Sequence, residues 1–290
     1  MSSAKGLAYS VLDVFAEGPL EGNPVSVTFG AARLATADMQ AIARETNLSE
    51  TTFVTSDRAR DGAWDVRIFT PGAELPYAGH PTLGTATAIR SHYLGGEARS
   101  VVLRLGIGLV PVKFADDGVA WLESPAARFE PYDDRELVAE ALSLPVESLD
   151  PKLPIEIQKN GAQQLFAPLR DRAALEAARI DSNAYRALMA TGVRGSLYPF
   201  APGARDPRNH FSVRLFAPVF GIAEDPATGS AAGFLGQYLV SHRAHPGETL
   251  DVRLEQGHAI SRPALLRVRQ GANAVEVGGR VIPVARGEWL

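Results

Sequence analysis

Two nine-residue stretches decide the fold, "AGHPTLGTA" at residues 78–86 and "EDPATGSAA" at residues 224–232. Both share one pattern of seven positions: a variable residue, proline, two variable residues, glycine, then threonine or serine, and finally alanine. His80 precedes the proline in the first stretch, and Asp225 precedes it in the second. Small and apolar residues follow, a pattern typical of a buried helix. The sequence therefore predicts one buried helix in each half, with Pro81 and Pro226 at its first position, where a missing N–H costs nothing.

The frame belongs to a longer internal repeat. Arg67 in "DVRIFTPG" and Arg214 in "SVRLFAPV" lie 147 positions apart, and His80 and Asp225 lie 145 apart. A shared offset of domain size indicates a duplicated domain and not a solenoid of short repeats. We expect the two arginines to form structural ion pairs.

Capping signals predict further helices in both halves. Thr36 is expected to cap a helix that buries Met39, and Asp171 to cap a second helix. Asp133 and Glu136 form a capping-box pattern before a third.

Short β-type runs outnumber the helices and do not alternate strictly with them, which favours an α+β protein with mixed sheets. A seam rich in proline and charge covers residues 124–134. We therefore expect an N-terminal half at 1–126 and a C-terminal half at 127–290, with the last strand returning to the N-terminal half.

Composition limits the function. The chain has 290 residues, a net charge of −4 and no cysteine, so it offers no basic field for nucleic acid or an anionic membrane and no thiolate chemistry. No apolar run is long enough for a signal peptide or a membrane span. We expect a cytoplasmic protein that binds neither nucleic acid nor membrane.

The predicted helix starts suggest a ligand site. Unpaired N–H groups and the positive end of the helix dipole at Gly79 and Gly229 would bind a small carboxylate. His80 and Asp225 would lie at the mouths of these starts. Helix packing alone is the alternative explanation of each frame.

The sequence resembles the PhzF-like proteins, within the diaminopimelate epimerase fold. The resemblance is carried by five stretches in order: "DVFAEGPLEGNPVSV" (13–27), "MQAIARETNLSETTFV" (39–54), "RIFTPGAELPYAGHPTLGTA" (67–86), "RLFAPVFGIAEDPATGSAAG" (214–233) and "EQGHAISRP" (255–263). It implies two pseudo-symmetric halves, each a mixed β-sheet wrapped around a central helix, with an active site in the cleft between them. It also implies a homodimer and no cofactor.

The resemblance also implies the site residues. Epimerases of this fold use two cysteines, and Ala78 and Thr228 stand at the corresponding places here. In PhzF-like proteins the acid/base is instead a glutamate in a Ser-Glu-Thr motif, which is Glu50 in this chain. His80, Asp225 and Ser230 match the other polar positions, with the N–H groups near Gly79 and Gly229 expected to hold the substrate carboxylate.

The implied reaction is isomerisation of a dihydro-hydroxyanthranilate-type acid, in which Glu50 removes a proton from one carbon and returns one to another. Such a group works best with a pKa near the working pH, so we expect desolvation to raise the pKa of Glu50 above about 4.3. Two alternatives remain open. One is an epimerase or racemase of an amino or hydroxy acid with non-thiol bases, and the other is a binding protein with a retained cleft.

Two further patterns carry weaker hypotheses. His242 and His245 have a spacing that can bind metal, but no third ligand is nearby, so no metal site is expected. The stretch 190–210 has a loop-like composition and is expected to shape substrate specificity.

Overall fold

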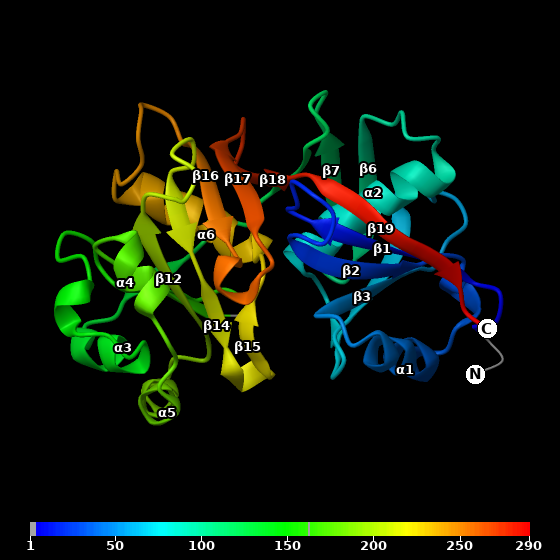
Figure 1. Ribbon diagram of the computed structural model, residues 1–290. Helices are drawn as coiled ribbons and strands as arrows, with labels where there is room; N and C mark the ends of the chain where they lie inside the picture. The colour runs from blue at the N-terminus through cyan, green and yellow to red at the C-terminus, as the bar shows by residue number, and fades with distance from the viewer. Residues whose placement is uncertain (1–3, 162) are drawn as a thin grey trace. The chain divides into compact units, whose positions relative to one another are not determined.

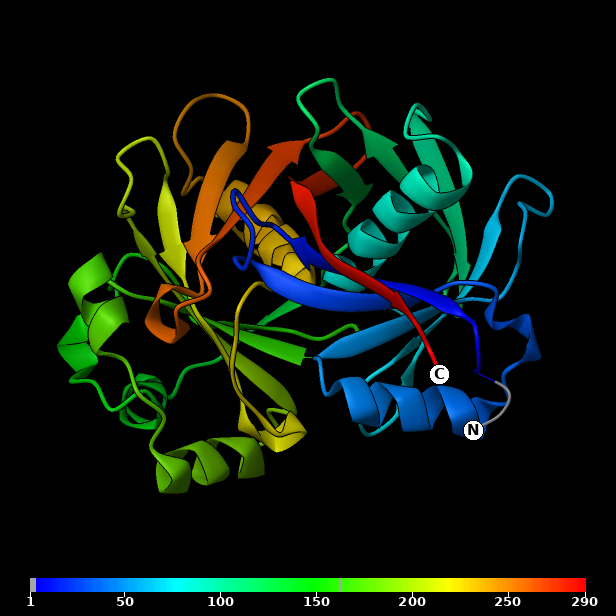
Figure 2. The ribbon, with the colours of Figure 1, turned by 45° about the vertical axis from the view of Figure 1, so that its right-hand side comes forward.

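The computed structural model describes residues 4–161 and 163–290 of a mixed α/β protein (Figures 1 and 2). The chain divides into two compact units. Unit 1 takes in the chain through Glu123 together with Gly278–Leu290, and unit 2 is the segment Ser124–Val277.

The strands of unit 1 form mixed parallel and antiparallel pairs. Its strands are β1 (Ala8–Val14), β2 (Asn23–Thr28), β3 (Glu50–Val54), β4 (Trp64–Phe69), β5 (Glu74–Leu75), β6 (Ser100–Leu105), β7 (Gly108–Phe114), β8 (Ala120–Glu123) and β19 (Val281–Glu288). Strand β1 lies between β2 and β19 and is antiparallel to both. Strand β3 is parallel to β2 and antiparallel to β4, and β4 is parallel to β6.

Helix α2 (Gly79–Tyr93) is the buried helix of unit 1 and packs against β1, β2, β3 and β6. A Cβ atom on Gly84 would lie 2.4 Å from Cγ1 of Val25 in β2, so a side chain of the sheet occupies the space above this glycine. Pro81 is the third residue of α2, not the first, because the helix begins at Gly79. Its missing N–H still falls among the unpaired donors of the first turn.

Helix α1 (Thr36–Thr46) confirms the apolar face expected from the sequence, with Met39, Ile42 and Ala43 buried. The expected cap was wrong. Thr36 is the first helical residue, and the N-cap residue Ala35 makes no side-chain cap hydrogen bond. The Thr36 hydroxyl instead accepts a hydrogen bond from Nη2 of Arg67 at 3.1 Å. A short 3₁₀ turn, η1 (Ala31–Arg33), precedes α1.

Unit 2 also mixes parallel and antiparallel pairs. Its strands are β9 (Phe129–Pro131), β10 (Glu156–Gln158), β11 (Gln163–Pro168), β12 (Gly195–Pro202), β13 (Phe211–Val213), β14 (Leu215–Ala217), β15 (Ile222–Asp225), β16 (Asp251–Gln256) and β17 (Ala264–Gln270), with β18 (Val275–Gly279) at the boundary with unit 1. Strands β11 and β12 are parallel, and β10 and β14 flank them antiparallel. The stretch 190–210 was expected to be a loop, but β12 occupies its middle and is buried up to Ala201.

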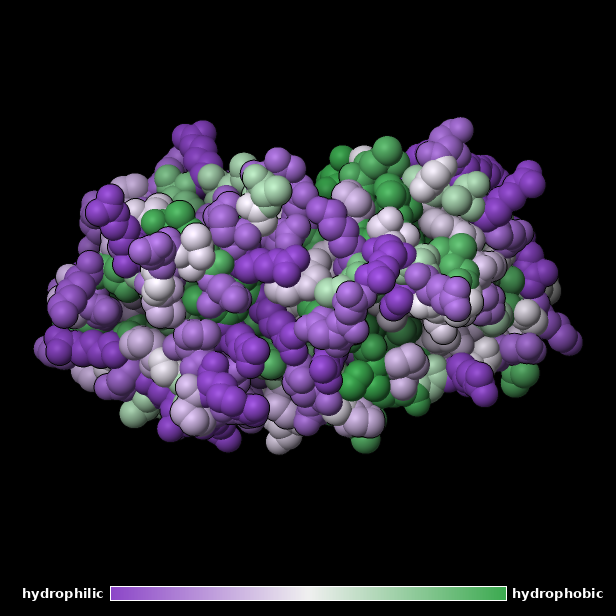
Figure 3. All heavy atoms as spheres, turned by 90° about the horizontal axis from the view of Figure 1, so that it is seen from above, coloured by the Kyte–Doolittle hydropathy of each residue, from purple (hydrophilic) through white to green (hydrophobic). Residues whose placement is uncertain are grey.

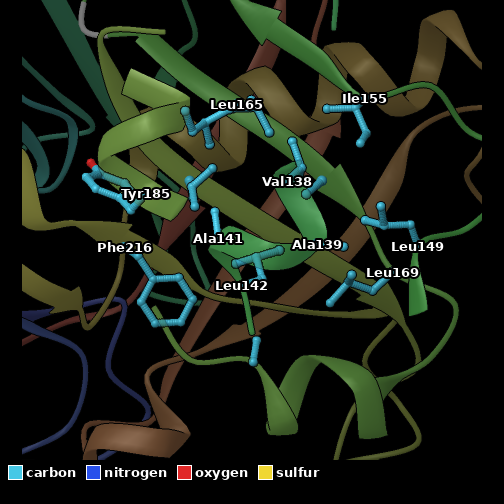
Figure 4. Packing of buried hydrophobic residues seen from close by; sticks show 14 of the residues in the cluster. Val138, Ala139, Ala141, Leu142, Leu149, Ile155, Leu165, Leu169, Tyr185 and Phe216 are labelled. Carbon is cyan, nitrogen blue, oxygen red and sulfur yellow. The ribbon is translucent and has the colours of Figure 1, made fainter. Parts of the chain in front are cut away.

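Three short helices cover one face of the unit 2 sheet, α3 (Arg135–Ala141), α4 (Arg172–Ala177) and α5 (Ser182–Ala190). Side chains such as Val138, Leu142, Leu165, Tyr185 and Phe216 form a closed apolar core between these helices and the strands (Figure 4). Asp171 caps α4 as expected, accepting from the Ala174 N–H at 2.8 Å. The cap of α3 is Asp134 and not Asp133, one residue from the expectation.

Helix α6 (Gly229–Ser241) is the buried helix of unit 2. The ring of Tyr238 stacks on Phe166 of β11 with centroids 6.0 Å apart. Pro226 lies outside the helix, which begins three residues later than the frame predicted. Three 3₁₀ turns complete the unit: η2 (Val146–Ser148), η3 (Pro218–Phe220) and η4 (His258–Ile260).

Within the described residues, no helix is long and apolar enough to cross a membrane. Hydrophilic residues cover most of the face shown in Figure 3, with smaller apolar areas between them. Exposed apolar side chains include Ile107 in the turn between β6 and β7 and Leu109 in β7.

Candidate functional site

Glu50 and His80 meet in unit 1. Glu50 is the first residue of β3, opposite Val25 of β2 in parallel register, and His80 is the second residue of α2. Nε2 of His80 lies 3.4 Å from Oε2 of Glu50, with side-chain exposures of 6% and 14%. That distance is at the outer limit for a hydrogen bond. The two sequence-predicted residues therefore form a shielded carboxyl–imidazole pair, and their acid/base role stays a prediction.

His80 is neutral in this environment. Burial lowers the pKa of His80 to about 3, against a smaller opposing effect of a hydrogen bond to the backbone of Pro24. Pro24 has no N–H, so the imidazole donates to its carbonyl oxygen and one ring nitrogen carries the proton. Assigning that proton to the nitrogen facing away from Glu50 leaves Nε2 as an acceptor facing the carboxyl group. The pair can then hold or release one proton between an imidazole nitrogen and a carboxyl oxygen.

Asp225 is held in a hydrogen-bonded turn of unit 2. It is the last residue of β15 and is buried. The Thr228 hydroxyl donates to Oδ2 of Asp225. Nε2 of Gln256 donates to the Asp225 carbonyl oxygen at 2.9 Å, and Oε1 of Gln256 accepts from the Thr228 N–H at 3.2 Å. The carboxylate is thus fixed four residues before α6 begins at Gly229.

Both helix starts lack a side-chain cap. The N-cap residues Ala78 of α2 and Thr228 of α6 make no side-chain cap hydrogen bond, and Gly79 and Gly229 are the first helical residues. The first N–H groups of a helix have no partner within it, and the helix dipole adds positive potential there. An uncapped helix start is a general anion-binding feature, and the expected role of these glycines in binding a carboxylate stays a prediction.

The two buried helices match each other in a register that differs from the one read in the sequence. Ser230, not Asp225, takes the same place as His80, because each is the second residue of its helix. The spacing between the two helix starts, Gly79 and Gly229, is 150 positions. The same spacing separates Glu74 from Glu224. The proline frame had matched His80 with Asp225, which belongs to the strand before α6.

The two arginines of the repeat make structural ion pairs, as expected. Arg67 contacts Glu74 at 2.6 and 2.7 Å, and Arg214 contacts Glu224 at 2.7 and 3.0 Å. Each guanidinium also lies over an aromatic ring two residues on, 5.1 Å from Phe69 and 4.6 Å from Phe216. Neither arginine is free to bind a substrate anion with its full charge.

Sequence reasoning missed the residues that hold the site in place. Pro24 and Gln256 both lie in stretches that carried the family resemblance, yet neither was assigned a role. Their contacts depend on a backbone carbonyl and on a strand 28 residues beyond Thr228, which no local pattern reveals. His242, half of the weak metal pair, contacts Glu156 at 3.0 Å, and among the described residues no cluster could hold a metal ion.

Comparison with known proteins assigns the class. Residues 12–287 match the family model PhzC-PhzF, described as phenazine biosynthesis-like protein. The chain therefore belongs to the PhzF family, and it is an isomerase of that family.

Individual relatives are similar over nearly their whole length. The trans-2,3-dihydro-3-hydroxyanthranilate isomerase of Pseudomonas aeruginosa is 38% identical, over 96% of this chain and 98% of its own. An uncharacterized isomerase of Escherichia coli is 33% identical over 96% of each chain. A PhzF-family structure from Bacillus anthracis superposes with a TM-score of 0.87 at 26% identity, covering 99% of both chains.

The wider fold family is also represented. A hydroxyproline epimerase from Agrobacterium vitis gives a TM-score of 0.58 at 14% identity, over 98% of this chain and 92% of its own. This similarity concerns the fold alone. The chain is thus structurally like both PhzF proteins and the proline racemase and epimerase fold.

Proposed function

We propose that this protein is a cofactor-independent isomerase that moves a proton on a small cyclic carboxylate of the dihydro-hydroxyanthranilate type. The observation that carries the proposal is the shielded pair of Glu50 and His80, 3.4 Å apart. Relatives that are 36–38% identical over almost their entire length carry the name of that isomerase, which supports the substrate class.

Glu50 would act as both base and acid. Its carboxylate takes a proton from one ring carbon, the electrons of that C–H bond move through the conjugated system, and the resulting carboxylic acid returns the proton to another carbon. No electron or proton is gained or lost overall, so the step needs no redox partner. A carboxyl group shielded from bulk water keeps the same proton during this transfer.

His80 would support this cycle without competing for the proton. Because burial lowers the pKa of His80 to about 3, the ring stays neutral at physiological pH. A neutral imidazole can accept a hydrogen bond from protonated Glu50, or from a substrate hydroxyl or amine, and release it when Glu50 ionises.

The substrate carboxylate would bind to N–H groups at Gly79 or Gly229, assisted by the Ser230 hydroxyl. Asp225, fixed by Thr228 and Gln256, would contact an amine or hydroxyl of the same substrate. We also infer that units 1 and 2 descend from one duplicated domain, in which each sheet surrounds its central helix. The matched Arg67–Glu74 and Arg214–Glu224 pairs support this inference. A homodimer is the expected assembly, and sedimentation velocity would test it.

Product formation and the isotope content of the product test the proposal directly. The protein is incubated with trans-2,3-dihydro-3-hydroxyanthranilate in deuterium oxide, and the product is followed by mass spectrometry. Wild type should isomerise the substrate and return mostly the original proton, because a shielded carboxyl group exchanges little with deuterium oxide during the transfer. Glu50→Gln should lose activity by at least about a hundredfold. Glu45→Gln, the same chemical change at an exposed site in α1, is the matched control and should remain active.

A different outcome would favour the epimerase alternative. A predicted epimerase from Pseudomonas aeruginosa is 34% identical with a TM-score of 0.79, covering 98% of this chain and 99% of its own. Deuterium uptake at a stereocentre of an amino or hydroxy acid, with inversion and no double-bond migration, would replace the isomerase proposal. Ligand binding with no turnover of any candidate would indicate a binding protein.

A further inference from the structure

One face of the unit 2 sheet carries buried polar groups that the proposed mechanism does not use. Side chains alternate along β11 and β12, so residues such as Leu165 and Leu197 face the apolar core under α3 and α5 (Figure 4). Gln164 and Tyr198 therefore project from the opposite face, the face on which Phe166 stacks against Tyr238 of α6.

Three atoms on this face have no hydrogen-bond partner among residues 4–161 and 163–290. They are Oε1 of Gln158, Oε1 of Gln164 and the hydroxyl of Tyr198. The three side chains are buried, with residue exposures of 0%, 5% and 0%. Most buried polar groups in proteins are hydrogen-bonded, so three neighbouring exceptions call for a ligand or bound water.

These atoms are neighbours in the sheet. Gln158 of β10 lies opposite Gln164 of β11, and Gln164 lies opposite Ser196 of β12, two residues before Tyr198. The amide of Gln158 is oriented by its neighbour, because its Nε2 donates to the carbonyl and side-chain oxygens of Asn160. Its Oε1 is therefore left for another donor.

The same face continues to the start of α6. Strands β12 and β14 are antiparallel, with Leu197 opposite Phe216, and the Pro199 carbonyl accepts from the Arg214 N–H. In this register Tyr198 lies opposite Leu215. Leu215 in turn lies opposite Asp225. Tyr198 and Asp225 thus share a face with one strand between them. Burial raises the pKa of the Tyr198 phenol, and the negative charge of Asp225 adds to that increase.

The other buried phenols of this unit behave differently. Tyr185 donates to the Gly195 carbonyl at 2.9 Å, and Tyr238 donates to the Pro154 carbonyl at 2.6 Å. Both hydroxyls stabilise the fold. The Tyr198 hydroxyl has no such partner among the described residues, although Tyr198 is as fully buried as Tyr238.

We propose that Gln158, Gln164 and Tyr198 form a polar cluster that binds the amino group of the substrate. Amide oxygens only accept hydrogen bonds, and a phenol oxygen can also accept, so the group they bind must donate several N–H bonds. The nearby Asp225 carboxylate favours an amine over an anion. The inference rests on the proposed function, because the same substrate would place its carboxylate at an N-terminal helix start.

Calorimetric titration with two aromatic probes tests the polar cluster without requiring turnover. The probes are 3-hydroxyanthranilate and 3-hydroxybenzoate, which differ only in the amino group. Wild type should prefer the amine, and Tyr198→Phe and Gln164→Leu should each weaken binding of 3-hydroxyanthranilate by about tenfold. Binding of 3-hydroxybenzoate should not change in either variant.

Tyr185→Phe is the matched control, since it removes a buried phenol hydroxyl whose role is structural. It should lower the melting temperature and keep the preference for the amine. Tyr198→Phe should leave the melting temperature unchanged or raise it, because the lost hydroxyl has no partner in the part of the chain that the structure describes.

The result can be separated from the isomerase test. An amine preference that depends on Tyr198 and Gln164 supports the polar cluster even if the isomerase assay fails. A wild type that binds neither probe, or both equally, overturns the inference. So does a preference that survives in both variants, which would mean that bound water alone satisfies these atoms.

Discussion

Replacing His80 with glutamine should remove a defined part of the pH dependence of folding stability. Burial lowers the pKa of His80 from 6.5 to about 3, so between these values the unfolded chain binds a proton that the folded protein does not. The neutral ring therefore contributes stability that is fully present above pH 6.5 and is lost as the pH falls towards 3.

The magnitude follows from the same pKa. Between about pH 7.5 and about pH 5, the proton bound by this side chain in the unfolded chain, summed over the interval, amounts to roughly 1.5 pH units. This corresponds to a loss of about 2 kcal/mol in the free energy of unfolding. Urea unfolding at both pH values measures the loss of unfolding free energy in wild type and in His80→Gln. The variant should lose about 2 kcal/mol less than wild type across this interval.

A control separates this effect from general acid sensitivity. His92→Gln makes the same chemical change at an exposed position of α2 and serves as the matched control. If wild type and His80→Gln lost equal amounts, His80 would be protonated or solvated in the folded state. The neutral partner assigned to Glu50 would then be wrong.

Three further changes probe the scaffold. Arg214→Met should lower the free energy of unfolding in urea by about 3–5 kcal/mol, because it leaves the buried Glu224 side chain unpaired. Arg67→Met, at the more exposed pair, should lower it by about 1 kcal/mol or less. Equal losses would refute the difference in burial. Gly84→Ala should destabilise by about 1–3 kcal/mol, since its Cβ would overlap Val25, and an unchanged melting temperature would contradict that packing. Thr228→Val should lower kcat by about tenfold with little effect on the melting temperature, by freeing Asp225; unchanged kinetics would show that the hydroxyl does not position this carboxylate.

Local signals predicted local structure well. The spacing of Met39, Ile42 and Ala43 gave the buried face of α1, and Asp171 capped α4 as expected, because both depend only on residues within one or two turns. The caps at Thr36 and Asp133 were wrong by one residue. Asp134, of the same chemistry as Asp133, takes the cap of α3, whereas the Thr36 hydroxyl accepts a hydrogen bond from Arg67 and does not cap α1.

Contacts between distant strands could not be predicted from the sequence. The motif identified Glu50 and His80, but their distance depends on how β3 and α2 are placed in unit 1. The proline frame gave the wrong partner for His80, because equal spacing from a proline does not fix where a helix begins. Tyr198 was given no role because the prolines and glycines around it suggested a loop. Pairing with β11 and β14 instead makes this segment a buried strand.

The path of the chain has a consequence for biosynthesis. Strand β1 precedes every strand of unit 2 in the chain, but its partner β19 follows them all. Unit 2 is continuous and can fold while β1 still has an open edge, and an unpaired strand edge invites pairing with other chains. During translation, the half that carries Glu50 and His80 therefore closes last, and chaperones that shield nascent strands should act on it longest.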